Sequence, residues 1–477
     1  MLKIFNGKTI LNYCCFFAAW NSTTTISVQL KLKLIGLLLP VTLLLSSLAF
    51  AQDPPQYGTP FPHVPSASDA VIYQVNMRAF SADGNFQGVS SRLDNIKALG
   101  VNVVYLMPIY PVGLLKGINS PYAITDYKGI AEEFGSLGDL RALVDGAHER
   151  KMSVILDFIP NHTAWDHAWV SQHKDWYKQN AEGQLISPNG WLDVVQLDFT
   201  KQDLVDALIE SMRYWVFAAN VDGFRFDYAG GPPLEFWQQA VSSLRSINSH
   251  ELLLLAEDGR NENFTTDLDY NFGFSFFEEL HKVFNGADAR KLDHVHLNES
   301  RLAGNDQRVV RYTTNHDVNA SEGTPESIFG GDKGAMAAFV VSSYMRSTPM
   351  IYSGQEVGTV KPIAFPFTED TIDWSINKAK TTQYADIIRV FNHNEALRKG
   401  SLESYSSNNV VAFTRTIEYQ QAFVIVNPRG VKLDYALPES VADESWTDAF
   451  SGAALNLEAS FTINAHDYRV FIRRTTP

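Results

Sequence analysis

Cysteine is almost absent from this sequence. The chain of 477 residues has two cysteines, Cys14 and Cys15, and both lie near its start. If the N-terminal segment is removed, as argued below, the mature chain has no disulfide and no thiol nucleophile. It also has no cysteine at the cleavage site for lipid attachment.

Positive charge is also scarce. The 39 lysines and arginines are outnumbered by 53 aspartates and glutamates, which gives a net charge of −14. This balance argues against nucleic acid or an anionic membrane surface as a partner. After residue 52 no run is long and apolar enough to span a membrane, so we expect no stable membrane insertion of the mature chain. The composition is typical of a soluble acidic protein with a neutral or cationic ligand.

The one long apolar run lies near the N-terminus. Residues 31–52 read KLKLIGLLLPVTLLLSSLAFAQ, with two lysines before the apolar stretch and Ala49-Phe50-Ala51 after it. This pattern predicts a secretory signal peptide with an A-x-A cleavage site. We therefore expect 1–51 to be an N-terminal extension and signal peptide. Cleavage near Ala51 would leave a secreted or periplasmic protein, and the alternative is a membrane anchor.

The rest of the chain is rich in apolar residues, at 45% hydrophobic and 12% aromatic overall, enough for a large core. Continuous apolar strand-like runs alternate with helix-like ones, which indicates a parallel sheet covered on both faces. The expected strands are 71–77, 101–110, 153–160, 221–227, 251–257, 308–314 and 348–353, with an obscure one near 270–276. Eight strands would close a barrel. The alternative, an open doubly wound sheet, lacks the expected G-x-G-x-x-G after the first strand.

Helix-like segments separate these strands, and two regions break the alternation. The expected helices are 88–100, 136–151, 201–220, 233–249, 332–347 and 382–399. The first of the two regions is an insertion at 163–200 that carries four tryptophans. The second begins at residue 400, where the sequence is typical of short strands and turns. The sequence thus predicts a barrel in two parts, 52–162 and 201–399, the insertion between them, and a C-terminal antiparallel β domain at 400–477.

Several expected strands end on polar and charged residues. In such a barrel functional groups sit at the carboxyl ends of the strands. One aspartate there is unremarkable, because it often caps the following helix. Here four strand ends carry such residues, namely Asp157, Asn161 and His162; Arg225 and Asp227; Glu257 and Asp258; His316 and Asp317. Together they predict one functional site.

The spacing of two of these carboxylates is informative. Asp227 and Glu257 are 30 residues apart, about one strand-helix-strand unit. They would therefore follow adjacent strands, which lie about 4.8 Å apart. Retaining glycosidases need two carboxyl groups about 5 to 5.5 Å apart. Asp317 lies 60 residues beyond Glu257 and would approach from further round the rim.

These motifs resemble those of glycoside hydrolase family 13, the alpha-amylase family. DFIPNH, GFRFD, LLAED and TTNHD resemble the family's four main motifs in their order and spacing. VVQLD at 194–198 resembles the motif that ends the inserted domain, and PYAITDY at 121–127 the segment with a tyrosine under the reacting sugar. The match extends from about residue 71 to 356.

The resemblance implies an α/β fold: a (β/α)8 TIM barrel with a short inserted domain B after strand 3 and a C-terminal antiparallel β-sandwich domain. It also implies a retaining α-glycosidase or transglycosylase. Carried over by position, Asp227 would be the nucleophile and Glu257 the general acid/base, while Asp317 would hold hydroxyls of the distorted sugar.

The same resemblance gives roles to the surrounding residues. Arg225 would pair with Asp227 and keep it ionised. His162 and His316 would hydrogen-bond sugar hydroxyls, and Tyr122 would form the stacking floor. Asp157 is expected to be structural.

The family resemblance leaves calcium open. Asn161 matches a position where many members place a metal-binding asparagine, and Asp83-Gly84-Asn85 fits both an oxygen-ligand loop and a plain turn. No organic cofactor is implied. One departure concerns the leaving-group side, where many members carry a Lys-His pair and this chain has Gly230 and Gly231.

We therefore expect a secreted hydrolase of alpha-1,4-glucans or maltooligosaccharides, with an oligo- or polysaccharide as its partner. The shared motifs leave open a transglycosylase, or a hydrolase of a short substrate such as trehalose, sucrose or a cyclodextrin. A non-catalytic glucan-binding protein is the third alternative, and it is disfavoured because all three acids are present. The sequence predicts no oligomeric state.

Overall fold

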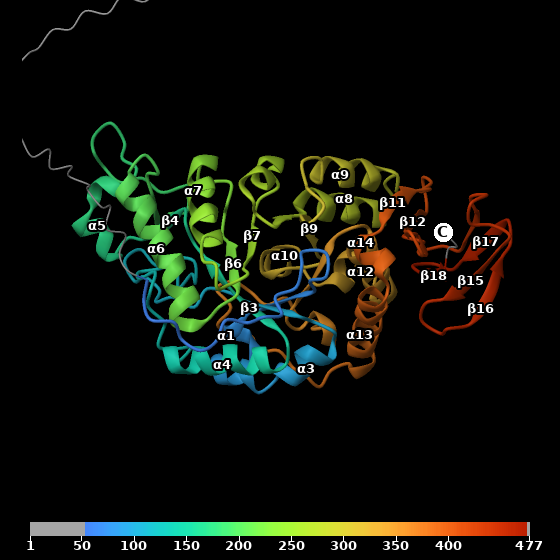
Figure 1. Cartoon of the computed structure of the whole chain (residues 1–477), viewed down its shortest axis with the longest axis horizontal. Helices are drawn as coiled ribbons and strands as arrows, with labels where there is room; N and C mark the ends of the chain where they lie inside the picture. The colour runs from blue at the N-terminus through green and yellow to red at the C-terminus, as the bar shows by residue number, and fades with distance from the viewer. Residues whose placement is uncertain (1–52, 475–477) are drawn as a thin grey trace, which may run out of the picture. The chain divides into compact units, whose positions relative to one another are not determined.

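The computed structural model describes residues 53–474, and a closed barrel of eight parallel strands lies at its centre (Figure 1). The barrel strands are β1 (Ile72–Val75), β2 (Val103–Leu106), β3 (Ser153–Phe158), β6 (Gly223–Phe226), β7 (Leu253–Ala256), β8 (Tyr270–Phe272), β9 (Arg308–Arg311) and β10 (Thr348–Tyr352). Their order around the barrel is β1-β10-β9-β8-β7-β6-β3-β2. The barrel prediction is confirmed, and β8 supplies the obscure strand. The expected signal peptide at 1–51 lies outside the described residues.

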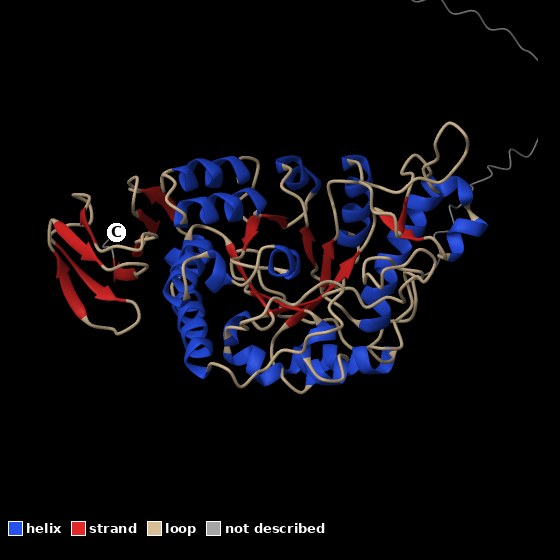
Figure 2. Ribbon diagram, turned by 180° about the vertical axis from the view of Figure 1, so that it is seen from behind, coloured by secondary structure: helices blue, strands red, loops and turns tan. Residues whose placement is uncertain are grey.

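Helices cover the outside of these strands (Figure 2). The longer ones are α4 (Leu137–Glu149), α6 (Gln202–Ala219), α7 (Leu234–Arg245), α8 (Phe274–Phe284), α9 (Lys291–Glu299), α12 (Asp332–Tyr344) and α13 (Lys378–His393). The sequence did not predict α8 and α9. The shorter ones include α1 (Met77–Phe80), α10 (His316–Ser321), α11 (Pro325–Ile328) and α14 (Glu395–Lys399). Helix α14 shows that the expected helix 382–399 is two helices.

The prediction of a single helix at 88–100 is wrong. The structure has α2 (Phe86–Ser90) and α3 (Leu93–Ala98) instead. The Ser91 hydroxyl donates to the Gly88 carbonyl at 2.7 Å, and Arg92 has a non-helical backbone with φ −116° and ψ 8°. Such side-chain bonds to the backbone compete with helix continuation.

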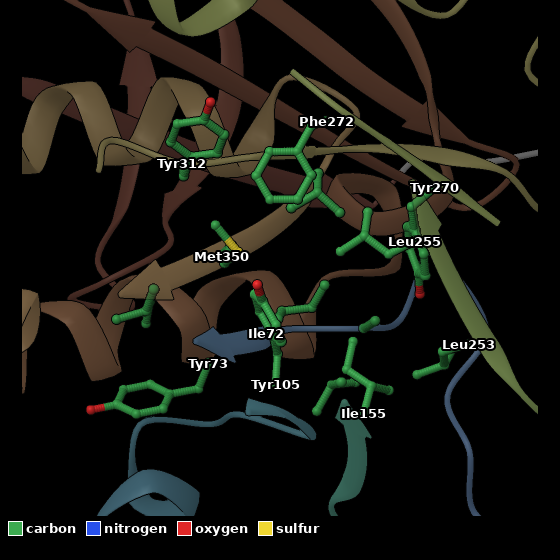
Figure 3. Packing of buried hydrophobic residues seen from close by; sticks show 14 of the residues in the cluster. Ile72, Tyr73, Tyr105, Ile155, Leu253, Leu255, Tyr270, Phe272, Tyr312 and Met350 are labelled. Carbon is green, nitrogen blue, oxygen red and sulfur yellow. The ribbon is translucent and has the colours of Figure 1, made fainter. Parts of the chain in front are cut away.

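Every residue of the eight barrel strands is buried, which explains their continuous apolar runs. Figure 3 shows Ile72, Tyr105, Ile155, Phe272 and Met350, from five different strands, gathered in this core. The strands are therefore held in place by packing on both sides. This rigidity positions the side chains that follow their carboxyl ends.

The insertion after β3 contains a short antiparallel pair, β4 (His162–Ala164) and β5 (Val194–Gln196), together with α5 (Ala168–Gln172) and η1 (Lys174–Trp176). Trp169 and Trp176 meet edge to face at 5.0 Å between ring centroids. Trp165 donates from Nε1 to the Leu192 carbonyl at 2.9 Å. These three tryptophans therefore hold the insertion together.

The C-terminal strands are antiparallel. They are β11 (Ser401–Ser404), β12 (Val411–Ile417), β13 (Gln420–Val426), β14 (Leu433–Ala436), β15 (Glu444–Asp448), β16 (Ala454–Leu457), β17 (Ser460–Ile463) and β18 (Tyr468–Arg474). Six form one sheet in the order β11-β12-β13-β18-β15-β16, and β14 pairs with β17. Arg415 is fully buried and donates to the Tyr344 carbonyl at 2.7 Å and the Gly400 carbonyl at 2.8 Å, which joins this sheet to α12.

Strand β6 approaches β7 unusually closely at its first residue. Gly223 has φ +146°, and a Cβ there would lie 1.9 Å from the Leu253 carbonyl oxygen. We predict that Gly223→Ala lowers the free energy of unfolding by about 3 kcal/mol or more, because either the strand pair must separate or the backbone must be strained. Chemical denaturation measures this change.

Gly259 provides the matched control. A Cβ at Gly259 meets no atom within 4 Å, so Gly259→Ala should change the stability by less than about 0.5 kcal/mol. A Gly223→Ala protein as stable as the unmodified chain would contradict the close approach of β6 and β7.

Candidate active site

A cavity of about 760 Å³ opens at the carboxyl ends of the barrel strands. Six of the seven residues predicted from the sequence to act in catalysis or substrate binding line it: Tyr122, His162, Asp227, Glu257, His316 and Asp317. The seventh, Arg225, lies beneath the cavity wall and is completely buried. The structure thus brings together residues from segments almost 200 positions apart.

The barrel register places Asp227 beside Glu257. Strands β6 and β7 pair in parallel with Phe226 opposite Ala256, so the next residue on each strand is one of the two acids. The Asp227 amide donates to the Phe158 carbonyl at 2.8 Å, and the Glu257 amide to the Phe226 carbonyl at 3.0 Å. Each acid is therefore held by the backbone of the neighbouring strand.

Tyr228 continues this arrangement. Its φ is +43°, which is uncommon for a residue with a side chain and marks a tight turn directly after Asp227. In this conformation its amide donates to Glu257 Oε2 at 2.8 Å. The turn after one acid therefore orients the carboxylate of the other.

Arg225 connects the acids below the cavity. Its Nη1 lies 2.7 Å from Asp157 Oδ1 and 3.0 Å from Asp227 Oδ1, and its Nη2 forms an ion pair with Glu257 Oε1. Asp157 is also fully buried and accepts from the Tyr105 hydroxyl at 2.7 Å. Because Asp157 does not line the cavity, these contacts agree with the structural role expected of it.

The shared guanidinium only partly offsets the burial of these carboxylates. Burial raises the pKa of Asp227 well above its usual value, although Arg225 acts in the opposite direction. Burial likewise raises the pKa of Asp157 to about 6. Burial alone would lower the pKa of Arg225, but Asp157 and Glu257 raise it well above its usual value. Arg225 therefore remains charged, and the ion pair with Asp227 exists, but Asp227 is easier to protonate than an ordinary aspartate.

Both predicted histidines are uncharged at neutral pH. Burial lowers the pKa of His162 to about 4 and, together with Arg225, that of His316 to about 3. His316 Nδ1 lies 2.9 Å from Gln74 Nε2, and its Nε2 lies 2.7 Å from the Tyr122 hydroxyl. With Gln74 as donor to Nδ1, the ring proton resides on Nε2. These histidines can therefore hydrogen-bond hydroxyl groups without adding charge.

Tyr122 and Asp317 complete the predicted set. The Tyr122 and His316 rings stack at 5.5 Å, which gives one wall of the cavity a flat aromatic surface. Asp317 lies in the first turn of α10 with its side chain 64% exposed, and its Oδ2 is 3.4 Å from His316 Nε2. An exposed carboxylate beside a neutral histidine can accept hydrogen bonds from a ligand.

The geometry gives little support to the predicted calcium site. Asn161 Oδ1 is buried without a hydrogen-bond partner in the described part of the chain. It lies close to the backbone of Gly231, since a Cβ added to that glycine would be 2.2 Å from this oxygen. Asn85 accepts from the Gly88 amide at 3.0 Å as the cap of α2, so the Asp83-Gly84-Asn85 segment is a turn and a helix cap. No group of three or more His, Cys, Asp or Glu side chains within 53–474 could hold a metal ion. The residues do not fit a carboxylate-rich calcium site, and we assign calcium no step.

Several cavity residues were not predicted from the sequence. These are Ile118, Trp191, Tyr228, Arg260, Phe274 and Phe365, together with Tyr105 and Gln74 beneath the wall. Gln74 carried a usable signal, since it is a polar residue within an otherwise apolar strand. Trp191, one of the four tryptophans of the insertion, is 39% exposed and lines the cavity.

Chemically, the cavity combines two adjacent carboxylates with neutral hydrogen-bonding groups and aromatic walls. Adjacent carboxylates can act as a nucleophile and an acid on one bond. Neutral donors and aromatic faces suit a ligand rich in hydroxyl groups and C–H faces.

The chain is similar to several known proteins in sequence and in fold. The family model "Alpha amylase, catalytic domain" matches residues 61–401. The chain is similar to alpha-amylase MalA of Haloarcula japonica, with 25% identity over 429 residues, 84% of this chain and 61% of that protein. It is 25% identical to neopullulanase 2 of Thermoactinomyces vulgaris over 402 residues, 77% of this chain and 67% of that protein. The crystal structure of an alpha-amylase from Lactobacillus plantarum superposes with a TM-score of 0.77 at 26% identity, covering 85% of this chain and 99% of the other.

The raised pKa of Asp227 predicts a pH-dependent stability change. Between its usual and its raised pKa the folded chain binds more protons than the unfolded chain, so stability falls as pH rises through this window. Asp227→Asn cannot ionise at this position. We therefore expect its stability relative to the unmodified chain to increase as pH rises above the usual aspartate pKa of about 4, measured by thermal unfolding.

Asp139→Asn is the control, because its stability should change with pH in the opposite direction. The Ser136 hydroxyl lowers the pKa of Asp139 in the first turn of α4, so this aspartate stabilises the fold above its usual pKa and loses that effect in acid. Asp139→Asn should therefore lose relative stability as pH rises. A parallel response of both variants would contradict the electrostatic description of the site.

Proposed function

Because the chain belongs to the alpha-amylase family of glycoside hydrolases, we propose that it cleaves alpha-1,4-glucans or maltooligosaccharides with retention of configuration. The observation that supports this most is the pairing of Asp227 and Glu257 at adjacent, in-register strand ends of one cavity. The names of the similar proteins, alpha-amylase and neopullulanase, support an alpha-glucan as the substrate class.

The proposed reaction has two steps. Asp227 attacks the anomeric carbon while Glu257 gives its proton to the leaving oxygen, so the glycosidic bond breaks and a covalent glycosyl-enzyme forms. Glu257, now ionised, takes a proton from water, and the resulting hydroxide equivalent displaces Asp227 from the anomeric carbon. Two inversions leave the product with its original α configuration.

The neighbouring residues would assist these steps without changing charge. Arg225 stabilises the Asp227 carboxylate when it departs, because its charge is buried and directly paired with it. Asp317 and the neutral His162 and His316 would bind hydroxyls of the sugar under attack, which stacks on Tyr122. The same glycosyl-enzyme can react with a second sugar in place of water. Transglycosylation is therefore one alternative activity. Hydrolysis of a short substrate is another.

We further propose that the protein acts outside the cytoplasm, after cleavage near Ala51. This proposal depends on residues 31–52, whose sequence has the features of a secretory signal. Within 53–474, no helix has both the length and the apolar character needed to cross a membrane.

Maltoheptaose tests the proposed reaction. The protein should release short products that appear first as α-anomers in early-time NMR spectra, and chromatography at high substrate should reveal any longer transfer products. Asp227→Asn and Glu257→Gln should each lower kcat by at least about a thousandfold, because each removes a group that reacts in the first step.

The expected pH profile follows from the pKa of Asp227. On the acid side kcat/KM should fall as Asp227 takes up a proton, at a pH above the usual aspartate pKa, because burial raises its pKa. Asp139→Asn, outside the cavity, should retain full activity. A folded Asp227→Asn protein with undiminished turnover would rule out the assigned nucleophile.

A further inference from the structure

Arg260 occupies the cavity wall next to the expected acid. It lies three residues after Glu257 at the carboxyl end of β7, and it lines the cavity together with Gly230 and Asp258. No step of the proposed reaction uses it. A partly exposed arginine in a substrate cavity is nevertheless a strong candidate for ligand recognition.

The guanidinium of Arg260 is held in one position by the protein. Its Nε forms an ion pair with Asp258 Oδ2, and its Nη2 donates to the Ala229 carbonyl at 2.6 Å. Asp258 Oδ2 also accepts from Asn263 Nδ2 at 3.1 Å, which fixes the carboxylate. The arginine therefore has little rotational freedom left to lose when a ligand binds.

After this anchoring, Arg260 still has a donor group that can bind a ligand. Arg260 uses Nε and Nη2 for its bonds to the described residues, and Nη1 forms none with them. The side chain is 32% exposed. Gly230 adds room here, since a Cβ at that position would crowd Asp258 Oδ1 at 3.3 Å. A preorganised donor thus borders an open part of the cavity.

The position of Arg260 identifies the part of the substrate that it can reach. Tyr122, His316 and Asp317 gather on one wall, where the sugar attacked by Asp227 would stack. Arg260 follows the same strand as Glu257, and an acid that protonates the leaving oxygen must stand next to the leaving sugar. Arg260 is therefore on the leaving-group side of the cleaved bond.

We propose that Arg260 determines specificity on this side, by donating from Nη1 to hydroxyl groups of the sugar unit beyond the cleaved bond. During cleavage Arg260 binds the leaving sugar. That sugar is absent from the second step, so during transfer Arg260 binds the acceptor sugar that takes its place. This inference rests on the proposed function and specifies a residue for its leaving-group side.

The test compares a substrate that has leaving-side sugars with one that has none. Maltoheptaose offers sugar units to Arg260, whereas α-maltosyl fluoride has only fluoride as its leaving group. Arg260→Met keeps an unbranched apolar side chain but removes the guanidinium with its donors and charge. It should lower kcat/KM for maltoheptaose about 10- to 100-fold, and this loss should be at least about tenfold larger than the loss for α-maltosyl fluoride.

Arg245→Met is the matched control. Arg245 is anchored in the same way, with Nη2 at 2.7 Å from Asp269 Oδ1 and Nη1 bonded to the Leu252 carbonyl at 2.5 Å, and it is 28% exposed. It does not line the active-site cavity. Its replacement should leave the ratio of the two kcat/KM values unchanged.

A second readout follows transfer directly. With α-maltosyl fluoride as donor and added maltose as acceptor, Arg260→Met should lower the ratio of transfer to hydrolysis, and Arg260→Lys should restore part of it. Equal losses on both substrates would show that Arg260 only holds the turn after Asp227, and would overturn the inference, as would no loss on either. If the unmodified protein turned over neither substrate, the proposed function itself would fail.

Discussion

The site depends on one buried cation. Arg225 is completely enclosed at the end of β6, and its guanidinium contacts Asp157, Asp227 and Glu257. A charge buried at such depth is costly without a counter-charge, for the arginine as well as for the acids. The arginine and the acids therefore offset part of one another's burial cost, which explains why charged residues can end strands that are otherwise apolar.

The barrel makes this arrangement possible by setting the spacing of the acids in the backbone. Asp227 and Glu257 follow two strands in direct register, and Gly223 lets those strands approach closely at their other end. The turn at Tyr228 then uses a main-chain amide to orient the Glu257 carboxylate. Because these constraints come from paired strands in a packed core, they survive variation in the surrounding loops, where substrate preference is decided.

Much of this could be read from the sequence because the informative residues follow buried strands. An apolar run that ends in charge, such as GFRFDY, predicts both the strand and its functional end, and six of the seven predicted site residues lie at such strand ends. Tyr122 lies in the 121–127 segment instead and was identified through the family resemblance. Trp191 and Phe365 could not be found in this way, because they lie in long loops whose path follows no period. The split of the helix at 88–100 has a related cause, since it occurs at Ser91 and Arg92, two residue types that do not mark a helix end in a sequence.

The electrostatics of the cavity restrict what it can accept. Asp227, Glu257 and Asp317 place three carboxyl groups in the cavity, while Arg225 is already shared between two of them, and burial keeps His162 and His316 neutral. Arg260 adds little net charge, because Asp258 is paired with it. An anionic ligand would lie beside these carboxyl groups, whereas a neutral polyol meets hydrogen-bond donors, acceptors and aromatic faces. In such a site the polarity of the walls selects for an uncharged sugar. On our proposal, the distinction between one glycan and another rests on the groups around the leaving side, where Gly230 opens space and Arg260 has an Nη1 that bonds to none of the described residues.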